Sequence, residues 1–162
     1  MRNSALLAIV IATLLGSCGS DIVVGDNQSM GGTWDQGQVV QFQLPELDSL
    51  KTYNVFFHIR NTNDYPYNNL YLIASMEFPH GKTIKDTLEY RMANPDGTWL
   101  GTGIGSVKES KLWYKEGVRF FEPGSYSLRV EHAMRNNGEV QGVSTLPGIT
   151  EVGYSIEKSP EQ

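Results

Sequence analysis

Apolar and polar residues alternate along most of the chain from residue 38 onward, with the period of two that is typical of half-buried β-strands. The clearest case is the segment with Val40, Phe42 and Leu44, in which glutamines fill the intervening positions and Pro45 ends the run. No long segment has apolar residues at helical spacing. The alternation therefore predicts an all-β domain, with further strands over residues 52–60, 70–78, 84–91, 126–131 and 152–157.

Turn residues separate these strands and indicate the fold class. Asn94-Pro95-Asp96-Gly97, Pro123-Gly124 and Asn136-Asn137-Gly138 are typical turn sequences. Residues 98–121 are expected to form shorter strands around Trp99, Trp113 and Phe120. About seven to nine short strands at this spacing predict a single antiparallel β-sandwich, Ig-like or jelly-roll-like, with a small barrel as the alternative. Tyr126 directly follows a turn, which predicts a tyrosine corner, in which its hydroxyl bonds to a nearby backbone group.

The N-terminus has the pattern of a bacterial lipoprotein signal. Arg2 precedes an apolar stretch from Ala5 to Leu15, which is too short for a membrane span of about 20 residues. Leu15-Gly16-Ser17-Cys18 then resembles a lipobox, which predicts cleavage between Ser17 and Cys18 and acylation, with palmitate as a typical acyl group, of the Cys18 thiol. Two or three acyl chains on one residue anchor a protein durably.

These features predict four segments. Residues 1–17 are expected to be a signal peptide, 18–37 a lipidated N-terminus and linker, 38–158 the β-sandwich and 159–162 a polar tail. The linker is expected because its five glycines come with little periodicity. The sandwich would then lie on a lipid tether outside the cytoplasm.

Charge and cysteine content exclude several classes of function. With 13 Lys plus Arg against 18 Asp plus Glu, the net charge of -5 argues against nucleic acid as a partner. Cys18 is the only cysteine, so an intramolecular disulfide and a thiolate zinc site are excluded. The sequence therefore predicts no cofactor and no metal.

Candidate catalytic residues form no recognisable motif. His58, His80 and His132 lack metal-ligand spacing and are expected to lie on the surface. There is no Gly-x-Ser-x-Gly elbow for a nucleophile. Gly101, Gly103 and Gly105 lack the spacing and the following helix of a phosphate-binding loop, so they predict a flexible or bulged connection. A hydrolase would need two carboxylates about 5–9 Å apart in a cleft, which sequence cannot show.

Compact aromatic clusters are the more suggestive feature. Tyr65 and Tyr67 flank a proline next to Asp64, Trp113 precedes Tyr114, and Trp99 lies nearby in sequence. Exposed aromatic rings of this kind contribute binding energy at protein interfaces or stack on sugars, whereas buried rings would belong to the core. These six residues are therefore candidates for a protein-interaction surface. A carbohydrate-binding platform of Trp99, Trp113 and Tyr65 is the alternative.

An ordered set of segments resembles the gliding motility-associated lipoprotein GldH family of Bacteroidota-type bacteria. It begins with Asn61-Thr-Asn-Asp-Tyr-Pro-Tyr-Asn-Asn-Leu-Tyr-Leu72 and continues with Trp99-Leu-Gly-x-Gly-x-Gly105, Trp113-Tyr-Lys115 and Gly148-Ile-x-x-Val-Gly153. The resemblance covers nearly all of the chain after Cys18. It implies a non-enzymatic lipoprotein that supports assembly or stability of the gliding apparatus, which shares parts with type IX secretion.

The expected partners follow from the resemblance and the lipobox. They are the membrane, through the lipid on Cys18, and other envelope proteins of the gliding and secretion machinery. Gly19 follows Cys18 where an inner-membrane retention signal would place Asp. We therefore expect the periplasmic face of the outer membrane in preference to the inner membrane.

Overall fold

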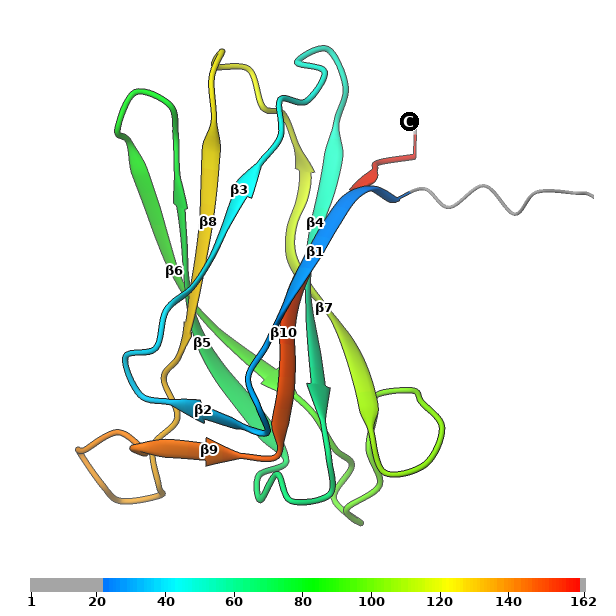
Figure 1. Ribbon diagram of the computed structural model, residues 1–162, viewed down its shortest axis with the longest axis vertical. Helices are drawn as coiled ribbons and strands as arrows, with labels where there is room; N and C mark the ends of the chain where they lie inside the picture. The colour runs from blue at the N-terminus through cyan, green and yellow to red at the C-terminus, as the bar shows by residue number, and fades with distance from the viewer. Residues whose placement is uncertain (1–21, 161–162) are drawn as a thin grey trace, which may run out of the picture.

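A computed structural model describes residues 22–160 of the chain. The expected signal peptide and Cys18 lie outside the described residues. Within them the protein is all-β (Figure 1), and no helix there could span a membrane. Its ten strands are β1 (Ile22–Ser29), β2 (Thr33–Asp35), β3 (Val40–Leu44), β4 (Tyr53–Asn61), β5 (Asn69–Glu77), β6 (Thr83–Arg91), β7 (Lys108–Val118), β8 (Tyr126–His132), β9 (Thr145–Pro147) and β10 (Ile149–Lys158).

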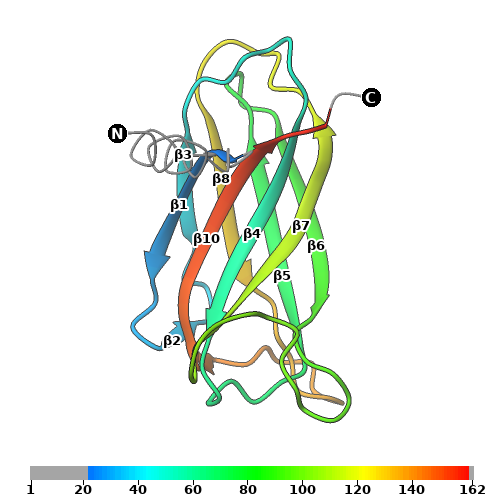
Figure 2. The same ribbon diagram turned by 90° about the vertical axis from the view of Figure 1, so that its right-hand side faces the viewer.

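Eight of the strands form two four-stranded antiparallel sheets. The two sheets pack face to face, as Figures 1 and 2 show together. The first sheet has the order β1-β10-β4-β7 and the second β3-β8-β5-β6, while β2 and β9 pair with each other at one end. The predicted antiparallel sandwich is confirmed. Because the chain crosses repeatedly between two four-stranded sheets in this order, the topology is the jelly roll.

The alternation seen in the sequence corresponds to the two faces of each strand. Val40, Phe42 and Leu44 on β3 point into the core, whereas the glutamines between them are exposed. On β5, Leu70 and Leu72 are fully buried in the same way. The core between the sheets is therefore lined by every second residue, as a period of two requires.

The sandwich begins earlier than the sequence predicted. β1 and β2 lie inside residues 18–37, which were expected to be a linker, so that boundary is wrong from Ile22 onward. β1 is an edge strand, exposed along almost its whole length, that is held by backbone pairing to β10. Backbone pairing needs no apolar periodicity, which is why the alternation did not reveal this strand.

Residues 98–121 also differ from the prediction. In place of several short strands there is a loop up to Val107 and then the single strand β7 of 11 residues. Ser110, Leu112 and Tyr114 are its buried positions. The glycines of residues 101–105 lie in the loop, as expected, where a Cβ on Gly103 would come within 2.4 Å of the Val107 carbonyl oxygen.

The predicted tyrosine corner is confirmed. The Tyr126 hydroxyl accepts a hydrogen bond of 3.0 Å from the backbone N–H of Glu122, four residues upstream. The Tyr126 ring is buried and packs edge-to-face on Phe120, at 5.0 Å between ring centroids. This contact fixes the loop between β7 and β8.

The small β2–β9 sheet closes one end of the core. Trp34 on β2 and Leu146 on β9 are fully buried, and the Trp34 ring meets the ring of His132 at 5.5 Å between centroids. His132 is only 4% exposed, so the expectation that all three histidines are surface residues is wrong for this one. Its strand alternation places it inward, on the same face as Leu128 and Val130.

Candidate functional site

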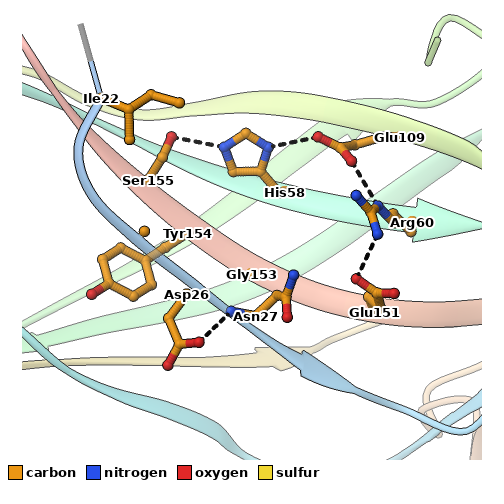
Figure 3. Close-up of a pocket in the computed structure, with 11 residues that line it drawn as sticks. Ile22, Asp26, Asn27, His58, Arg60, Glu109, Glu151, Gly153, Tyr154 and Ser155 are labelled. Atoms are coloured by element: carbon orange, nitrogen blue, oxygen red, sulfur yellow. Dashed lines mark hydrogen bonds and ion pairs between the residues drawn. The ribbon is translucent and has the colours of Figure 1, made fainter. Parts of the chain in front are cut away.

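Polar and charged side chains gather on the outer face of the β1–β10–β4–β7 sheet, around a shallow hollow of about 330 Å³ (Figure 3). The strands bring them together from distant parts of the sequence. His58 on β4 lies beside Gly153 on β10 and Lys111 on β7. Arg60, two residues further along the same face, lies beside Glu151 and Glu109.

Five of these side chains form one continuous hydrogen-bonded chain, drawn as dashed lines in Figure 3. The Ser155 hydroxyl is 2.7 Å from His58 Nε2, and His58 Nδ1 is 3.2 Å from Glu109 Oε1. Arg60 then donates from Nε to Glu109 Oε2 at 2.7 Å and from Nη1 to Glu151 Oε2 at 2.9 Å. We call this set the polar chain.

Two glycines leave room above the polar chain. Gly25 on β1 lies opposite Ser155, and Gly153 on β10 lies opposite Asn27. A Cβ on Gly153 would come within 2.8 Å of the Asp26 carbonyl oxygen, so a side chain there would push β1 away from β10. The hollow therefore exists because Gly25 and Gly153 place no side chains on this part of the outer face, where β1 and β10 approach closely.

The charges of the polar chain are mutually stabilised. Hydrogen bonding from Arg60 holds the pKa of Glu109 below its usual value, against the opposing effect of partial burial. The pKa of Arg60 is raised, chiefly by its hydrogen bond to Glu109. Both groups thus stay ionised across the physiological range.

The order Ser155, His58, Glu109 has the connectivity of a hydrolytic triad, but the surroundings do not fit acyl transfer. Such chemistry needs an accessible hydroxyl and free backbone donors for the oxyanion. Ser155 is only 3% exposed, and it lies in the middle of β10, paired with β1 on one side and with β4 on the other. Its neighbouring backbone N–H groups therefore form the hydrogen bonds of the sheet and are not free to bind an oxyanion. The polar chain instead joins three strands across their outer face.

Sequence reasoning placed His58, Arg60 and Ser155 within predicted strands but could not find the polar chain. Its members are up to 97 residues apart, and only the strand register brings them into contact. The residues that pair across a sheet depend on which strands are neighbours, and the alternation of apolar and polar residues does not show which strands these are.

The aromatic candidates separate into two groups. At the end of the sandwich that contains β2 and β9, Tyr65 packs against Tyr67 and against Trp99, with centroids 5.8 Å and 6.1 Å apart. Trp99 Nε1 donates to Asn63 Oδ1 at 2.9 Å, and Asp64 is exposed beside it. We call the surface of residues 62–68 with Trp99 the aromatic end.

Trp113 belongs to the second group, on the outer face of β7. It is 53% exposed and packs on Phe56, with centroids 4.3 Å apart, while Lys111 lies over the Phe56 ring. Tyr114 points the other way, into the core, where its ring meets Phe57 and its hydroxyl donates to Asp86.

Two of the six candidate interaction residues are therefore core residues. Tyr65 is 3% exposed and Tyr114 is 8% exposed, and burial raises the pKa of both hydroxyls far above the ordinary value. The sugar platform of Trp99, Trp113 and Tyr65 is not formed either, because Tyr65 is buried and Trp113 packs in the other group. Asp64, Tyr67, Trp99 and Trp113 remain at least partly accessible.

Between residues 22 and 160, no three His, Cys, Asp or Glu side chains come together in a way that could hold a metal ion. His58 is part of the polar chain, His80 contacts Glu122 at 3.0 Å in an exposed turn, and His132 is buried beside Trp34. The three histidines thus lie in three separate environments.

Comparisons with known proteins agree with the sequence resemblance. The sequence model of the GldH lipoprotein family matches residues 23–156. The chain is 49% identical to "Gliding motility lipoprotein GldH homolog" of Christiangramia forsetii, over 98% of this chain and 99% of that protein. It is 48% identical to "Gliding motility lipoprotein GldH" of Flavobacterium johnsoniae, over 98% of both chains.

Solved structures resemble the chain only distantly. A family GH115 4-O-methyl-alpha-glucuronidase aligns with a TM-score of 0.34 and 12% identity, over 84% of this chain and 16% of the other. Dimeric latent PorU from Porphyromonas gingivalis aligns with a TM-score of 0.35 and 8% identity, over 89% of this chain and 14% of the other. We draw nothing on function from these likenesses. The match of the family over nearly all of the sandwich, with two relatives of almost half identical sequence, shows that this chain belongs to the GldH lipoprotein family.

Proposed function

We propose that the protein is a lipid-anchored envelope component that supports the assembly or stability of the gliding motility apparatus and of the associated type IX secretion. The observation that carries this proposal is the family match over residues 23–156, together with relatives that are named gliding motility lipoproteins. The proposed anchor is Cys18, acylated after cleavage behind Ser17.

The anchor fits the position of the sandwich in the chain. Only Gly19, Ser20 and Asp21 separate Cys18 from β1, which begins at Ile22. The acyl chains on Cys18 would hold the sandwich facing the periplasm. Because Gly19 follows Cys18, we place the anchor in the outer membrane in preference to the inner membrane.

We propose a non-catalytic role through contact with other envelope proteins. The polar chain supports this role because its serine is buried in a sheet whose backbone donors are used. The accessible candidate residues supply contact surface: Asp64, Tyr67 and Trp99 at the aromatic end, and Trp113 on β7. Large aromatic side chains of this kind are enriched among the residues that dominate binding energy.

Replacement of the relative in Flavobacterium johnsoniae by this chain tests the proposal. A deletion strain is expected to lose colony spreading and the export of type IX cargo, and expression of this chain is expected to restore both. A double change at the aromatic end, Asp64→Arg with Trp99→Ala, should reduce rescue at an unchanged protein level, whereas Thr87→Val on exposed β6 should not. Spreading and export that continue in the deletion strain would contradict the assembly role.

A further inference from the structure

The two ends of the sandwich lie at different distances from Cys18. β1 begins four residues after Cys18, and four residues of extended chain span at most about 14 Å. The end of the sandwich where β1 begins must therefore stay close to any lipid that is attached to Cys18. This inference rests on the acylation of Cys18 that is part of the proposed function.

Strand register shows which loops lie at that end. Ile22 pairs with Glu157 near the end of β10, and Tyr53 at the start of β4 pairs with both Lys158 and Val118. In the second sheet, Leu44 pairs with Tyr126. The loops of residues 45–52, 78–82 and 119–125 therefore lie at the same end of the sandwich as the start of β1. This end is uppermost in Figures 1 and 2. We call it the anchor end.

Two large apolar side chains at the anchor end point into solvent. Leu50 is 84% exposed and Phe121 is 64% exposed, although the neighbouring Phe120 is buried in the core. Ile22 and Val23, at the start of β1, are also about half exposed, at 49% and 42%. An apolar side chain that is held in water at the tip of a loop is stabilised when another apolar phase covers it.

The loops hold these side chains in place. The Asp48 carboxylate accepts a hydrogen bond of 3.0 Å from the backbone N–H of Leu50, and the Asp48 carbonyl accepts one from Lys51. The tyrosine corner bonds the backbone N–H of Glu122, directly after Phe121. The two apolar tips are thus fixed before any contact forms, which lowers the entropic cost of binding.

We propose that the anchor end docks on the lipid surface, with Leu50 and Phe121 inserted at the boundary between headgroups and acyl chains. The short tether brings the surface within reach, and the two fixed apolar tips supply the contact. The three loops contain three Lys or Arg (Lys51, Lys82, Arg119) against three Asp or Glu (Glu46, Asp48, Glu122). This balance means that insertion is apolar and does not depend on anionic lipid.

Docking at this end orients the whole molecule. β10 has 10 residues, and its length is about 33 Å at 3.3 Å per residue. The aromatic end and the loop that contains Ile104 would then be held at about that distance from the membrane. Ile104 is fully exposed at that far end, which makes it a matched control for Leu50.

Thiol labelling of the full-length lipidated protein tests this proposal. Single cysteines are introduced as Leu50→Cys, Phe121→Cys or Ile104→Cys, since the thiol of Cys18 is blocked by its acyl chain. Each variant is added to preformed vesicles of phosphatidylcholine and phosphatidylethanolamine, and its reaction with a water-soluble maleimide is timed. The same variants in a Cys18→Ser background, free in buffer, give the reference rates.

Vesicle binding is expected to slow labelling at positions 50 and 121 about tenfold or more, because burial of one large apolar side chain favours the covered state by that order. Labelling at position 104 should be unchanged. The proposal would be overturned if, on protein that floats with the vesicles, the labelling rates at all three positions equalled their reference rates in buffer. Protein that fails to float with the vesicles would instead contradict acylation of Cys18, and the docking proposal would fall with it.

Discussion

Two single side chains, one at each end of the sandwich, have structural roles that differ from those of their neighbours in sequence. Tyr126 closes the β7–β8 loop through one hydroxyl, and His132 takes a buried place that an apolar residue would normally occupy. In the part of the chain that the structure describes, neither ring nitrogen of His132 has a hydrogen-bond partner. Both residues are therefore suited to tests by single substitutions.

His132 is expected to make stability fall as the pH drops. Burial lowers its pKa below the ordinary value of 6.5, while the nearby backbone of Trp34 and the carboxylates of Glu131 and Asp35 oppose this only in part. From about pH 6.5 downward, the unfolded chain binds a proton at this residue that the folded chain does not, so the free energy of unfolding decreases. Urea unfolding of the wild type and of His132→Leu at several pH values measures the effect. The variant should show a flatter dependence between pH 7.5 and 5.5, and an unchanged slope would contradict the assignment.

Tyr126→Phe removes the hydroxyl that accepts from Glu122 N–H and leaves the ring in place. A net loss of about 1 kcal/mol in the free energy of unfolding is expected, since one hydrogen bond of this kind contributes that much. Chemical denaturation measures the change. A stability equal to that of the wild type would show that the Glu122 N–H finds water as an equivalent partner.

At the scale of strands, alternation predicted most of the sheet but not its edge or its register. β3, β4, β5, β6, β8 and β10 lie where a period of two placed them, because alternate apolar residues of each strand pack in or against the core. From Gly25 onward β1 has no apolar residue on either face, and its place comes from backbone pairing with β10. The polar chain could not be predicted for a related reason, since His58 and Ser155 meet only through the neighbour relation of β4 and β10.

Gly153→Val tests the close approach of β1 and β10. The new side chain would collide with the Asp26 backbone, so β1 should be displaced and the free energy of unfolding should fall by about 1–3 kcal/mol, as for other overpacked sites. Limited proteolysis should cut within residues 22–32 sooner than in the wild type. Thr87→Val introduces the same residue on exposed β6 and should change neither measurement. Wild-type resistance in Gly153→Val would contradict the role of β1 as part of the sandwich.

At the scale of the whole molecule, the jelly roll has two different ends, and only three residues separate Cys18 from the strand that begins at one of them. The anchor end has fixed apolar tips at Leu50 and Phe121, and the opposite end presents Trp99 and Asp64. If Cys18 is acylated, the first end meets lipid and the second faces the other proteins of the envelope. We therefore propose that the sandwich supports gliding only when it is held at the membrane.

A Cys18→Ala variant tests this claim most directly, in a Flavobacterium johnsoniae strain in which this chain replaces the relative. Colony spreading is measured together with the distribution of the protein between membrane and soluble fractions. We predict that the wild-type chain is found in the membrane fraction and restores spreading, whereas Cys18→Ala is made, is found in the soluble fraction and does not restore it. Full spreading by a soluble Cys18→Ala protein would contradict the account.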